Sequence, residues 1–228
     1  IVGYTGFQDA YDVVINGLRR LEYRGYDSAG IVLDSENSEF VVAKTKGKVD
    51  DLVAISKDLS GKANVGMGHT RCATHGVPSD RNSHPHVSNN GKIALVHNGI
   101  IENYQELKSE LQTLGYQFTS ETDTEVVAHL VNDALKTTPD LMKAVEQVVP
   151  HLKGAYALGI VHTNHPDELI AVREGSPLVI GVGIGENFIS SDQLALLPVT
   201  NRFIYLEEGD IARITRSSID VYVNGQAV

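Results

Sequence analysis

The sequence predicts an α+β fold in which helices pack against two β-sheets. Short apolar segments typical of strands fill the first and last thirds of the chain, and longer segments with helical spacing lie between them. This order of strands, helices and strands is typical of two sheets covered by helices. No Pro/Ser-rich linker or internal repeat interrupts the 228 residues, so positions 1–228 are predicted to form a single domain. A domain of that size needs no disulfide or metal for stability.

The first third of the chain combines one helix with four expected strands. Residues 1–4 form a short apolar strand, and apolar residues recur at helical spacing over 9–21. Residues 21–27 break that pattern and are predicted to form a loop. Three further strands are expected at 30–33, 40–43 and 65–69.

The middle of the chain begins with a long polar stretch at 70–91. It lacks periodicity, and loops of that length are usually functional or disordered. A strand is expected at 93–97, ending at the dipeptide Asn98-Gly99. Helices are then predicted at 104–114, 122–135 and 141–152. Ser120 is expected to cap the second helix, because Asp123 follows at the capping-box spacing.

Strand-like segments dominate the remainder of the chain from residue 155 onward. They are short, apolar and separated by residues that favour turns. Strands are therefore expected at 155–161, 169–172, 178–181, 188–190, 203–206, 211–214 and 219–223.

Composition restricts the classes of partner. The formal net charge is -10, and no basic stripe is present, which disfavours nucleic acid and anionic membranes. The one cysteine, Cys72, cannot form an internal disulfide, and no secretory apolar region is evident, so a cytoplasmic location is expected. No apolar run approaches the roughly 20 residues of a membrane span.

Two glycine-containing segments resemble motifs that the rest of the sequence does not support. Ile1-Val2-Gly3 matches the start of trypsin-like proteases, but the Gly-Asp-Ser-Gly segment and the several disulfides of those enzymes are missing. The glycine-rich segment 181–185 lacks the spacing and the following helix of a dinucleotide-binding loop. A tight connection between strands is the favoured interpretation of 181–185, and no cofactor is expected.

Histidines and the cysteine suggest two further sites. His84-Pro85-His86 is accompanied by three further histidines, His69, His75 and His97. No cysteine or carboxylate cluster joins them at ligand spacing, so no metal is expected. Cys72 follows Arg71 and lies near His75 in the sequence, which could suggest a Cys–His nucleophile. The neighbouring cation would lower the pKa of its thiol. A small side chain in a loop is still the favoured interpretation of Cys72.

Four residues carry chemistry that could form a site, and two of them, Arg71 and Asp123, could together grip the two charged ends of a free amino acid. Asn98-Gly99 is a strong turn dipeptide, and on the dipeptide alone a turn is favoured. The alternative is an oxyanion hole made of the Asn98 amide and a nearby backbone N–H. Arg71 could bind a carboxylate in bidentate fashion or be solvated. Asp123 could bind an ammonium group or stabilise a helix N-terminus.

Several motifs in one order resemble the amidotransferases with an N-terminal nucleophile. The segment 21–30, with its Tyr-Arg-Gly-Tyr-Asp core, is similar to the glucosamine-6-phosphate synthase family rather than to the amidophosphoribosyltransferase branch. The similarity extends over essentially the whole chain. Its other motifs lie at 69–76, 84–86, 97–103, 120–125, 176–178 and 190–196.

This resemblance implies a fold, a reaction and partners. The fold is the four-layer αββα sandwich of the N-terminal-nucleophile hydrolases, with two mainly antiparallel sheets between helix layers. The implied reaction is hydrolysis of L-glutamine to glutamate and ammonia, without a cofactor. In the family, a sugar isomerase domain of the same polypeptide uses that ammonia to convert fructose 6-phosphate to glucosamine 6-phosphate. A weak homodimer is also consistent with the resemblance.

The resemblance also assigns roles to particular residues. Arg71 is expected to bind the α-carboxylate of glutamine, with help from Thr74 and the backbone of His75. Asp123 is expected to hold the α-ammonium, near the Gly99 carbonyl. The Asn98 side chain and the Gly99 N–H are the expected oxyanion hole. Two supporting residues complete the set, Arg24 near the chain start and His84 in the loop that covers glutamine.

Two departures from the family pattern carry expectations of their own. The family's mature chain begins Cys-Gly-Ile-Val-Gly, and its first residue supplies both the nucleophilic thiol and the basic α-amine. Loss of a nucleophile costs on the order of 10⁶ in rate, so a polypeptide that starts at Ile1 is expected to bind glutamine without hydrolysing it. Cys72 replaces the Trp usual in the family at the mouth of the ammonia path, which predicts a looser seal.

Overall fold

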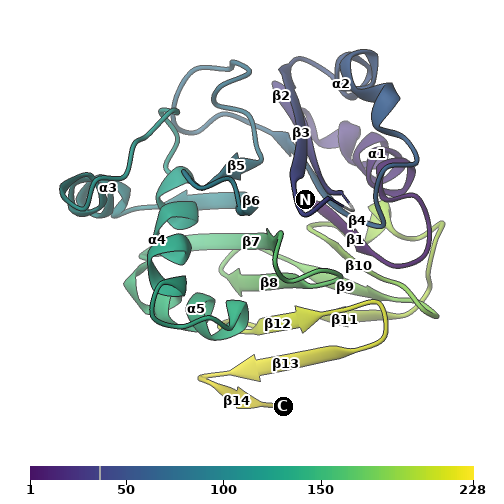
Figure 1. The fold of residues 1–228 in the computed structure, drawn as a ribbon. Coiled ribbons are helices and arrows are strands. Elements are labelled where there is room, and N and C mark those ends of the chain that lie inside the picture. The colour runs from purple at the N-terminus through teal and green to yellow at the C-terminus, as the bar shows by residue number, and fades with distance from the viewer. Residues whose placement is uncertain (36) are drawn as a thin grey trace.

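The computed structural model describes residues 1–35 and 37–228, and two seven-stranded sheets form its centre (Figure 1). Neighbouring strands in both sheets are antiparallel. Across the first sheet the strands are β11 (Phe203–Tyr205), β9 (Val179–Val182), β10 (Asn187–Ser190), β1 (Val2–Thr5), β4 (Val65–Arg71), β2 (Ser28–Asp34) and β3 (Phe40–Lys46). Across the second they are β14 (Gln226–Ala227), β13 (Ile219–Val223), β12 (Ile211–Ile214), β8 (Leu169–Glu174), β7 (Gly154–His162), β6 (Ile93–Ile101) and β5 (His86–Val87).

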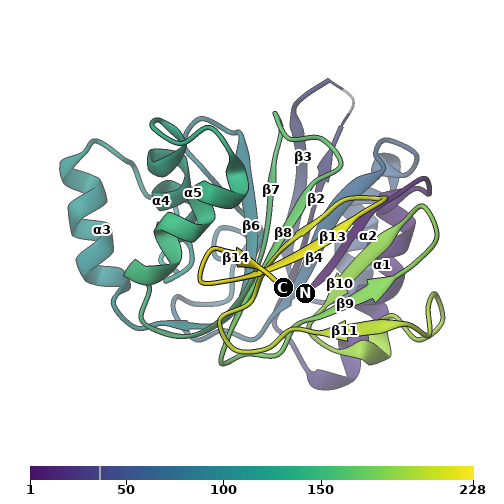
Figure 2. The same cartoon turned by 90° about the horizontal axis from the view of Figure 1, so that it is seen from below.

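Helices cover the outer face of each sheet. The first sheet carries α1 (Ala10–Leu21) and α2 (Val49–Ser56), and the second carries α3 (Tyr104–Thr113), α4 (Glu125–Leu135) and α5 (Leu141–Val148). Figure 2 shows the two helix groups on opposite sides of the paired sheets. Short 3-10 turns occur at Glu22–Arg24, Lys57–Leu59, Val149–His151 and Gln193–Ala195. The predicted four-layer αββα sandwich is confirmed.

Three apolar clusters lie between the four layers. One joins α1 and α2 to the first sheet, one joins the two sheets, and one joins the second sheet to α4 and its neighbours. The alternation of side chains along a strand explains how β1 serves two of them. Val2 and Tyr4 belong to the cluster under α1, whereas a methyl group on Gly3 would lie 2.6 Å from Ile189 and 3.5 Å from Leu169 on the opposite face.

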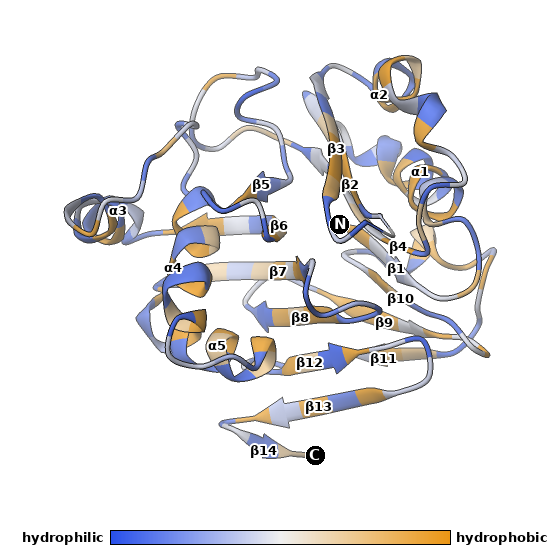
Figure 3. Cartoon of the chain, viewed as in Figure 1, coloured by the Kyte–Doolittle hydropathy of each residue, from blue (hydrophilic) through white to orange (hydrophobic). Residues whose placement is uncertain are grey.

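The helices are amphipathic, as their place at the surface requires. Figure 3 shows apolar and polar residues mixed along α1 and α4. In α1, Val14 and Leu18 are fully buried, and the Asp9 carboxylate caps the helix by accepting a hydrogen bond from the Tyr11 N–H at 3.2 Å. No helix within the described residues is both long enough and apolar enough to span a bilayer.

The structure corrects the expected end of the strand at 93–97. Strand β6 continues through Asn98 and Gly99 to Ile101, and its pairing with β7 is unbroken down to Gly154. The favoured turn at Asn98-Gly99 is therefore wrong. Pairing with β7 overrides the turn preference of the dipeptide. Gly99 has a φ of 113°, and a methyl group there would lie 2.1 Å from the Ala155 carbonyl oxygen, so glycine is required at this position.

The start of the helix expected at 122–135 also needs correction. Helix α4 begins at Glu125, and Ser120 does not cap it, because the Ser120 hydroxyl bonds the Thr122 hydroxyl at 3.1 Å. The Glu125 carboxylate instead accepts the N–H of Thr119 at 3.0 Å and that of Ser120 at 2.8 Å. Residues 119–124 are thus an irregular segment tied to the first turn of α4.

Helix α2 is an element that the sequence analysis missed. Its eight residues bury only Val49, Leu52 and Ser56, which is too short a pattern to show helical periodicity. Its start is nevertheless marked, because the Asp51 carboxylate accepts the Lys48 N–H at 2.7 Å.

Candidate active site

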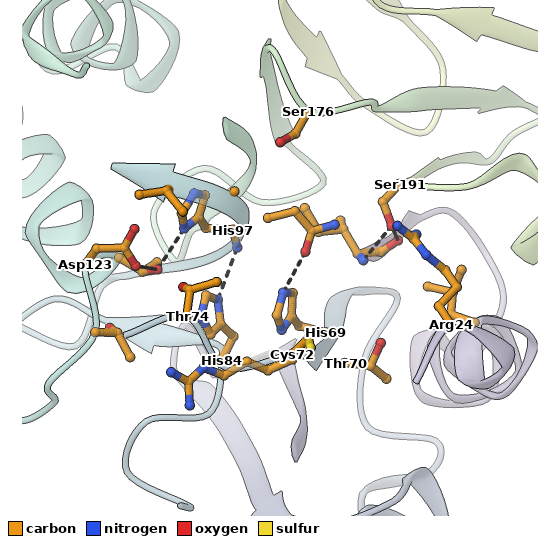
Figure 4. A pocket seen from close by; sticks show the side chains of 18 of the residues that line it. Arg24, His69, Thr70, Cys72, Thr74, His84, His97, Asp123, Ser176 and Ser191 are labelled. Carbon is orange, nitrogen blue, oxygen red and sulfur yellow. Dashed lines mark hydrogen bonds between the residues drawn. The ribbon is translucent and has the colours of Figure 1, made fainter. Parts of the chain in front are cut away.

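A cavity of about 420 Å³ lies where the ends of β4 and β6 meet, one strand from each sheet. β4 lines it with residues 69–71, β6 with 97–100, and the segment before α4 with 122–124. Figure 4 shows Asp123 and Thr74 at one end of the cavity and Arg24 and Ser191 at the other. The cavity thus brings together most of the residues singled out in the sequence, from segments far apart along the chain.

Arg71 is the last residue of β4 and is only 4% exposed. Its Nη2 donates to the carbonyl oxygens of His75 and Gly76, the second at 3.1 Å. Its Nη1 is buried and has no hydrogen-bond partner among the described residues. Burial lowers the pKa of the guanidinium, although the nearby carboxylates of Asp27 and Asp123 act in the opposite direction. A buried donor without a partner is costly, and Arg71 lines the cavity, so a shift of the guanidinium that lets Nη1 meet a ligand carboxylate would relieve that cost.

Asp123 lines the same cavity and is 3% exposed. Its Oδ2 accepts the Ile101 N–H at 2.7 Å, which fixes the carboxylate against the end of β6. Its Oδ1 lies 3.3 Å from the Thr124 hydroxyl and 3.9 Å from His75 Nδ1. A carboxylate held by a backbone donor and facing a cavity is suited to receive an ammonium group.

At Asn98 and Gly99, the edge of β6 opposite β7 is not paired with any strand of the described residues. The pairing of β5 with β6 extends only to Leu95, and beyond it the His97 N–H donates to His84 Nδ1 at 3.2 Å. The Ile101 N–H on the same edge donates to Asp123. Since N–H groups alternate between the two edges of a strand, the Gly99 N–H is expected to point to this edge, into the cavity.

Four buried histidines lie together at the cavity, His69 on β4, His97 on β6, His86 on β5 and His84 just before β5. The ring of His84 stacks on His69 with centroids 4.1 Å apart and meets His86 edge-on at 4.8 Å. Burial lowers the pKa of His69 and His84 well below the usual value, that of His86 to about 3 and that of His97 to about 4. These rings are therefore neutral near pH 7.

His84 approaches the first sheet as closely as the backbone allows. A methyl group at Gly30 on β2 would lie 1.7 Å from the His84 carbonyl oxygen. The Lys44 ammonium on β3 donates to the carbonyls of Ser83 at 3.0 Å and Pro85 at 3.2 Å. His84 was expected in a covering loop, and the structure describes it as a buried residue whose ring lines the cavity.

The remaining expected site residues differ in their relation to the cavity. Thr74 lines it, whereas the His75 side chain packs edge-on against Tyr104 at 4.9 Å and is not part of the lining. Arg24 lines the cavity and its Nη1 lies 3.4 Å from the Ser191 hydroxyl. The Ile1 nitrogen donates to the same hydroxyl at 3.0 Å, so position 1 is at the cavity wall.

Several lining residues received no role in the sequence analysis. Ser176, Pro177 and Ser191 lie within motifs that were noted only as points of resemblance, and Ser176 Oγ would be 2.9 Å from a methyl group on Gly99. His69 was considered only as a metal ligand. No group of three or more potential metal ligands was found in residues 1–35 and 37–228.

Comparison with known proteins places these residues in a family. The family model described as glutamine amidotransferase domain matches residues 69–198. A glutamine–fructose-6-phosphate aminotransferase (isomerizing) of Acinetobacter baylyi is 61% identical over 225 residues, which are 99% of this chain and 36% of that protein. The enzyme of the same name from Escherichia coli strain K12 is 54% identical over 222 residues. This chain spans about 36% of the length of either relative.

Solved structures agree with the fold. A glutamine phosphoribosylpyrophosphate amidotransferase from B. subtilis, complexed with ADP and GMP, superposes with a TM-score of 0.82 at 28% identity. The match covers 98% of this chain and 48% of that one. A glutamine aminotransferase class-II domain protein from Silicibacter pomeroyi has a TM-score of 0.64 at 13% identity and supports the fold alone.

Proposed function

Since this chain belongs to the glutamine amidotransferase domain family, we propose that its cavity binds L-glutamine and releases the side-chain amide as ammonia. One observation carries the proposal. The edge of β6 with Asn98 and Gly99 faces the same cavity that Arg71 and Asp123 line, and within the described residues the Arg71 guanidinium keeps one donor unused. These groups complement the amide, the α-carboxylate and the α-ammonium of one amino acid.

Binding would use charge at one end of the ligand. Arg71 would hold the α-carboxylate, supported by the Thr74 hydroxyl and by the backbone at His75, whose carbonyl Arg71 already engages. Asp123 would hold the α-ammonium, near the Gly99 carbonyl. His84 would support the cavity from below through its contact with the His97 backbone.

The chemical step would take place at the other end of the ligand. We propose that a cysteine preceding Ile1 in the full-length protein attacks the amide carbon, with its own α-amine taking the thiol proton. The Asn98 side-chain NH₂ and the Gly99 N–H would stabilise the oxyanion that forms. The protonated nitrogen then leaves as ammonia, and water hydrolyses the thioester to glutamate. Arg24 and Ser191, which contact each other beside Ile1, would order that end of the cavity.

The acceptor of the ammonia follows from the longer relatives. We propose that residues 1–228 act as one amidotransferase domain, joined to a sugar isomerase domain that converts fructose 6-phosphate to glucosamine 6-phosphate. This activity belongs to hexosamine biosynthesis and would take place in the cytoplasm. Free ammonia would pass from the cavity past Cys72, which lines it.

The proposal is tested by assaying the full-length protein with glutamine and fructose 6-phosphate. Both glutamate and glucosamine 6-phosphate are expected as products, and Asp123→Asn is expected to raise the KM for glutamine with a smaller effect on kcat. Glutamine binding without any glutamate release would favour a glutamine-binding regulatory module. Glutamate release that responds to another sugar phosphate would favour a related amidotransferase.

A further inference from the structure

Resting on the proposed function, we infer that His69 is a positioning residue that orients the side-chain amide of Asn98. His69 Nε2 and Asn98 Oδ1 are 2.9 Å apart, and Figure 4 shows this bond as the dashed line above His69. His69 lies on β4 in the first sheet and Asn98 on β6 in the second. The bond therefore spans the two sheets at the point where the cavity is formed.

The chemistry of a carboxamide makes this contact directional. Asn98 has one acceptor oxygen and one NH₂ donor, which point in different directions from the same carbon. With Oδ1 held by a donor on His69, the NH₂ group is turned away from His69, and Asn98 lines the cavity. A reversed amide would bring its NH₂ against the Nε2 proton and lose the bond.

His69 must carry its proton on Nε2 for this to hold, and its surroundings favour that tautomer. Burial keeps the pKa of His69 well below the usual value, so the ring carries a single proton. Nδ1 is buried without a hydrogen-bond partner in the described part of the chain, whereas Nε2 has Asn98 Oδ1. A proton on Nε2 is therefore donated to Asn98 Oδ1 at 2.9 Å.

The ring of His69 is also fixed in its plane. It is 3% exposed and stacks on His84 at 4.1 Å with an interplanar angle of 14°. His84 is in turn held by the His97 N–H, one residue before Asn98. The His69 ring is thus held against β6 through His84, and Asn98 is part of β6. This arrangement limits the movement of the donor relative to the amide.

A kinetic test separates positioning from general stability. His69→Phe keeps an aromatic ring beside His84 and removes the donor, and His69→Gln keeps a donor. In the full-length protein, His69→Phe is expected to lower kcat for glutamine hydrolysis about 10- to 100-fold with KM within about threefold, since small misplacements of a catalytic group have costs of this order. His69→Gln should recover most of the loss.

Two further comparisons make the test specific. His162 is a buried histidine on β7 that does not line the cavity, so His162→Phe controls for the replacement of a buried imidazole by a phenyl ring. If His69 acts through Asn98, the double variant with Asn98→Ala should be no slower than Asn98→Ala alone. Additive losses, or a loss no larger than that of His162→Phe, would overturn the inference.

The tautomer of His69 can be measured directly, without an activity assay. Nitrogen-15 NMR of the labelled full-length protein should show a protonated Nε2 and an unprotonated Nδ1 for His69 near pH 7. A proton on Nδ1 would refute the inference even if the variants fail to fold. Absence of glutaminase activity in the unmodified protein would instead refute the proposed function and leave the NMR result to decide the hydrogen bond.

Discussion

The two walls of the cavity are built in different ways. The wall formed by β6 is part of a sheet, its edge toward β7 is paired throughout, and Asp123 is bonded to its backbone at 2.7 Å. The opposite wall is the segment after β4, where Cys72 is exposed and the Ala73 N–H is held by the Asp27 carboxylate at 2.6 Å. The Arg71 guanidinium supports that segment through two carbonyls.

This difference fits the two tasks of the proposed reaction. Stabilising an oxyanion requires donors placed to within a fraction of an ångström, which a paired strand provides. Enclosing a small ligand requires a segment that can open, which loop backbone permits. Changes to the strand wall should therefore affect kcat, and changes to the loop wall should affect KM and ammonia retention.

The largest effect is expected for Asn98→Ala on the strand wall. Loss of one oxyanion-hole donor lowers kcat by about 10²- to 10³-fold in comparable sites, and KM for glutamine should change little. Steady-state glutaminase assays of the full-length protein measure both constants. A main effect on KM would show that Asn98 binds the ground state. It would contradict the expectation that the strand wall controls kcat and the loop wall KM.

A smaller effect is expected for Arg71→Lys, at the start of the loop wall. An ammonium cannot hold two backbone carbonyls and a ligand carboxylate in the fixed geometry of a guanidinium. KM for glutamine should rise about 10- to 100-fold, corresponding to roughly 1.4 to 2.8 kcal/mol, with kcat less affected. An unchanged KM would mean that the carboxylate binds elsewhere.

The strand wall should also be the acid-sensitive one. The pKa of His97 is lowered from 6.5 to about 4 and that of His86 to about 3, so below pH 6.5 the unfolded chain binds protons that the folded chain excludes. Stability is thus fully present above pH 6.5 and is lost as pH falls toward 4, by up to about 1.4 kcal/mol per pH unit for each group.

Chemical denaturation between pH 7 and pH 4 measures this loss. His86→Gln keeps a partner for the Thr122 hydroxyl. It should lower the number of protons taken up on unfolding by about one, and with it the slope of the unfolding free energy against pH. The exposed His151, replaced in the same way, is the matched control. Equal slopes for His86→Gln and the unmodified protein would contradict the assignment.

The smallest effect is expected for Cys72→Trp on the loop wall. An indole fills more of the cavity mouth than a thiol, so the ratio of free ammonia to glucosamine 6-phosphate should fall while kcat for glutamine hydrolysis stays within about threefold. Simultaneous assays of both products in the full-length protein provide the ratio. Equal leakage before and after the change would count against a seal at this position.

Sequence alone predicted the layers of the fold better than the local geometry of the site. Apolar periodicity is repeated over many strands and helices, so small errors at their ends do not alter the architecture. The Asn98-Gly99 turn failed because pairing with β7, a partner 55 residues or more away, decided the backbone there. Ser120 failed as a cap because α4 begins only at Glu125, and the Ser120 hydroxyl bonds the Thr122 hydroxyl instead.

The roles suggested for Arg71 and Asp123 rested on charge, which a sequence displays directly. That the two line one cavity is a property of the fold. Arg71 ends β4 in the first sheet, whereas Asp123 is bonded to β6 in the second. The part played by His69 had no signal of its own in the sequence. A histidine near the end of an apolar strand is equally typical of a core residue, and only its distance to Asn98 distinguishes the two.

Gly30 has a consequence for how this sequence can vary over time. Because the His84 carbonyl occupies the space where any side chain at position 30 would begin, every substitution there must move either β2 or the segment under the cavity. Positions such as 72, which border solvent, can exchange residues of very different size. Random mutagenesis followed by selection for activity should therefore retain glycine at 30 while recovering many residues at 72.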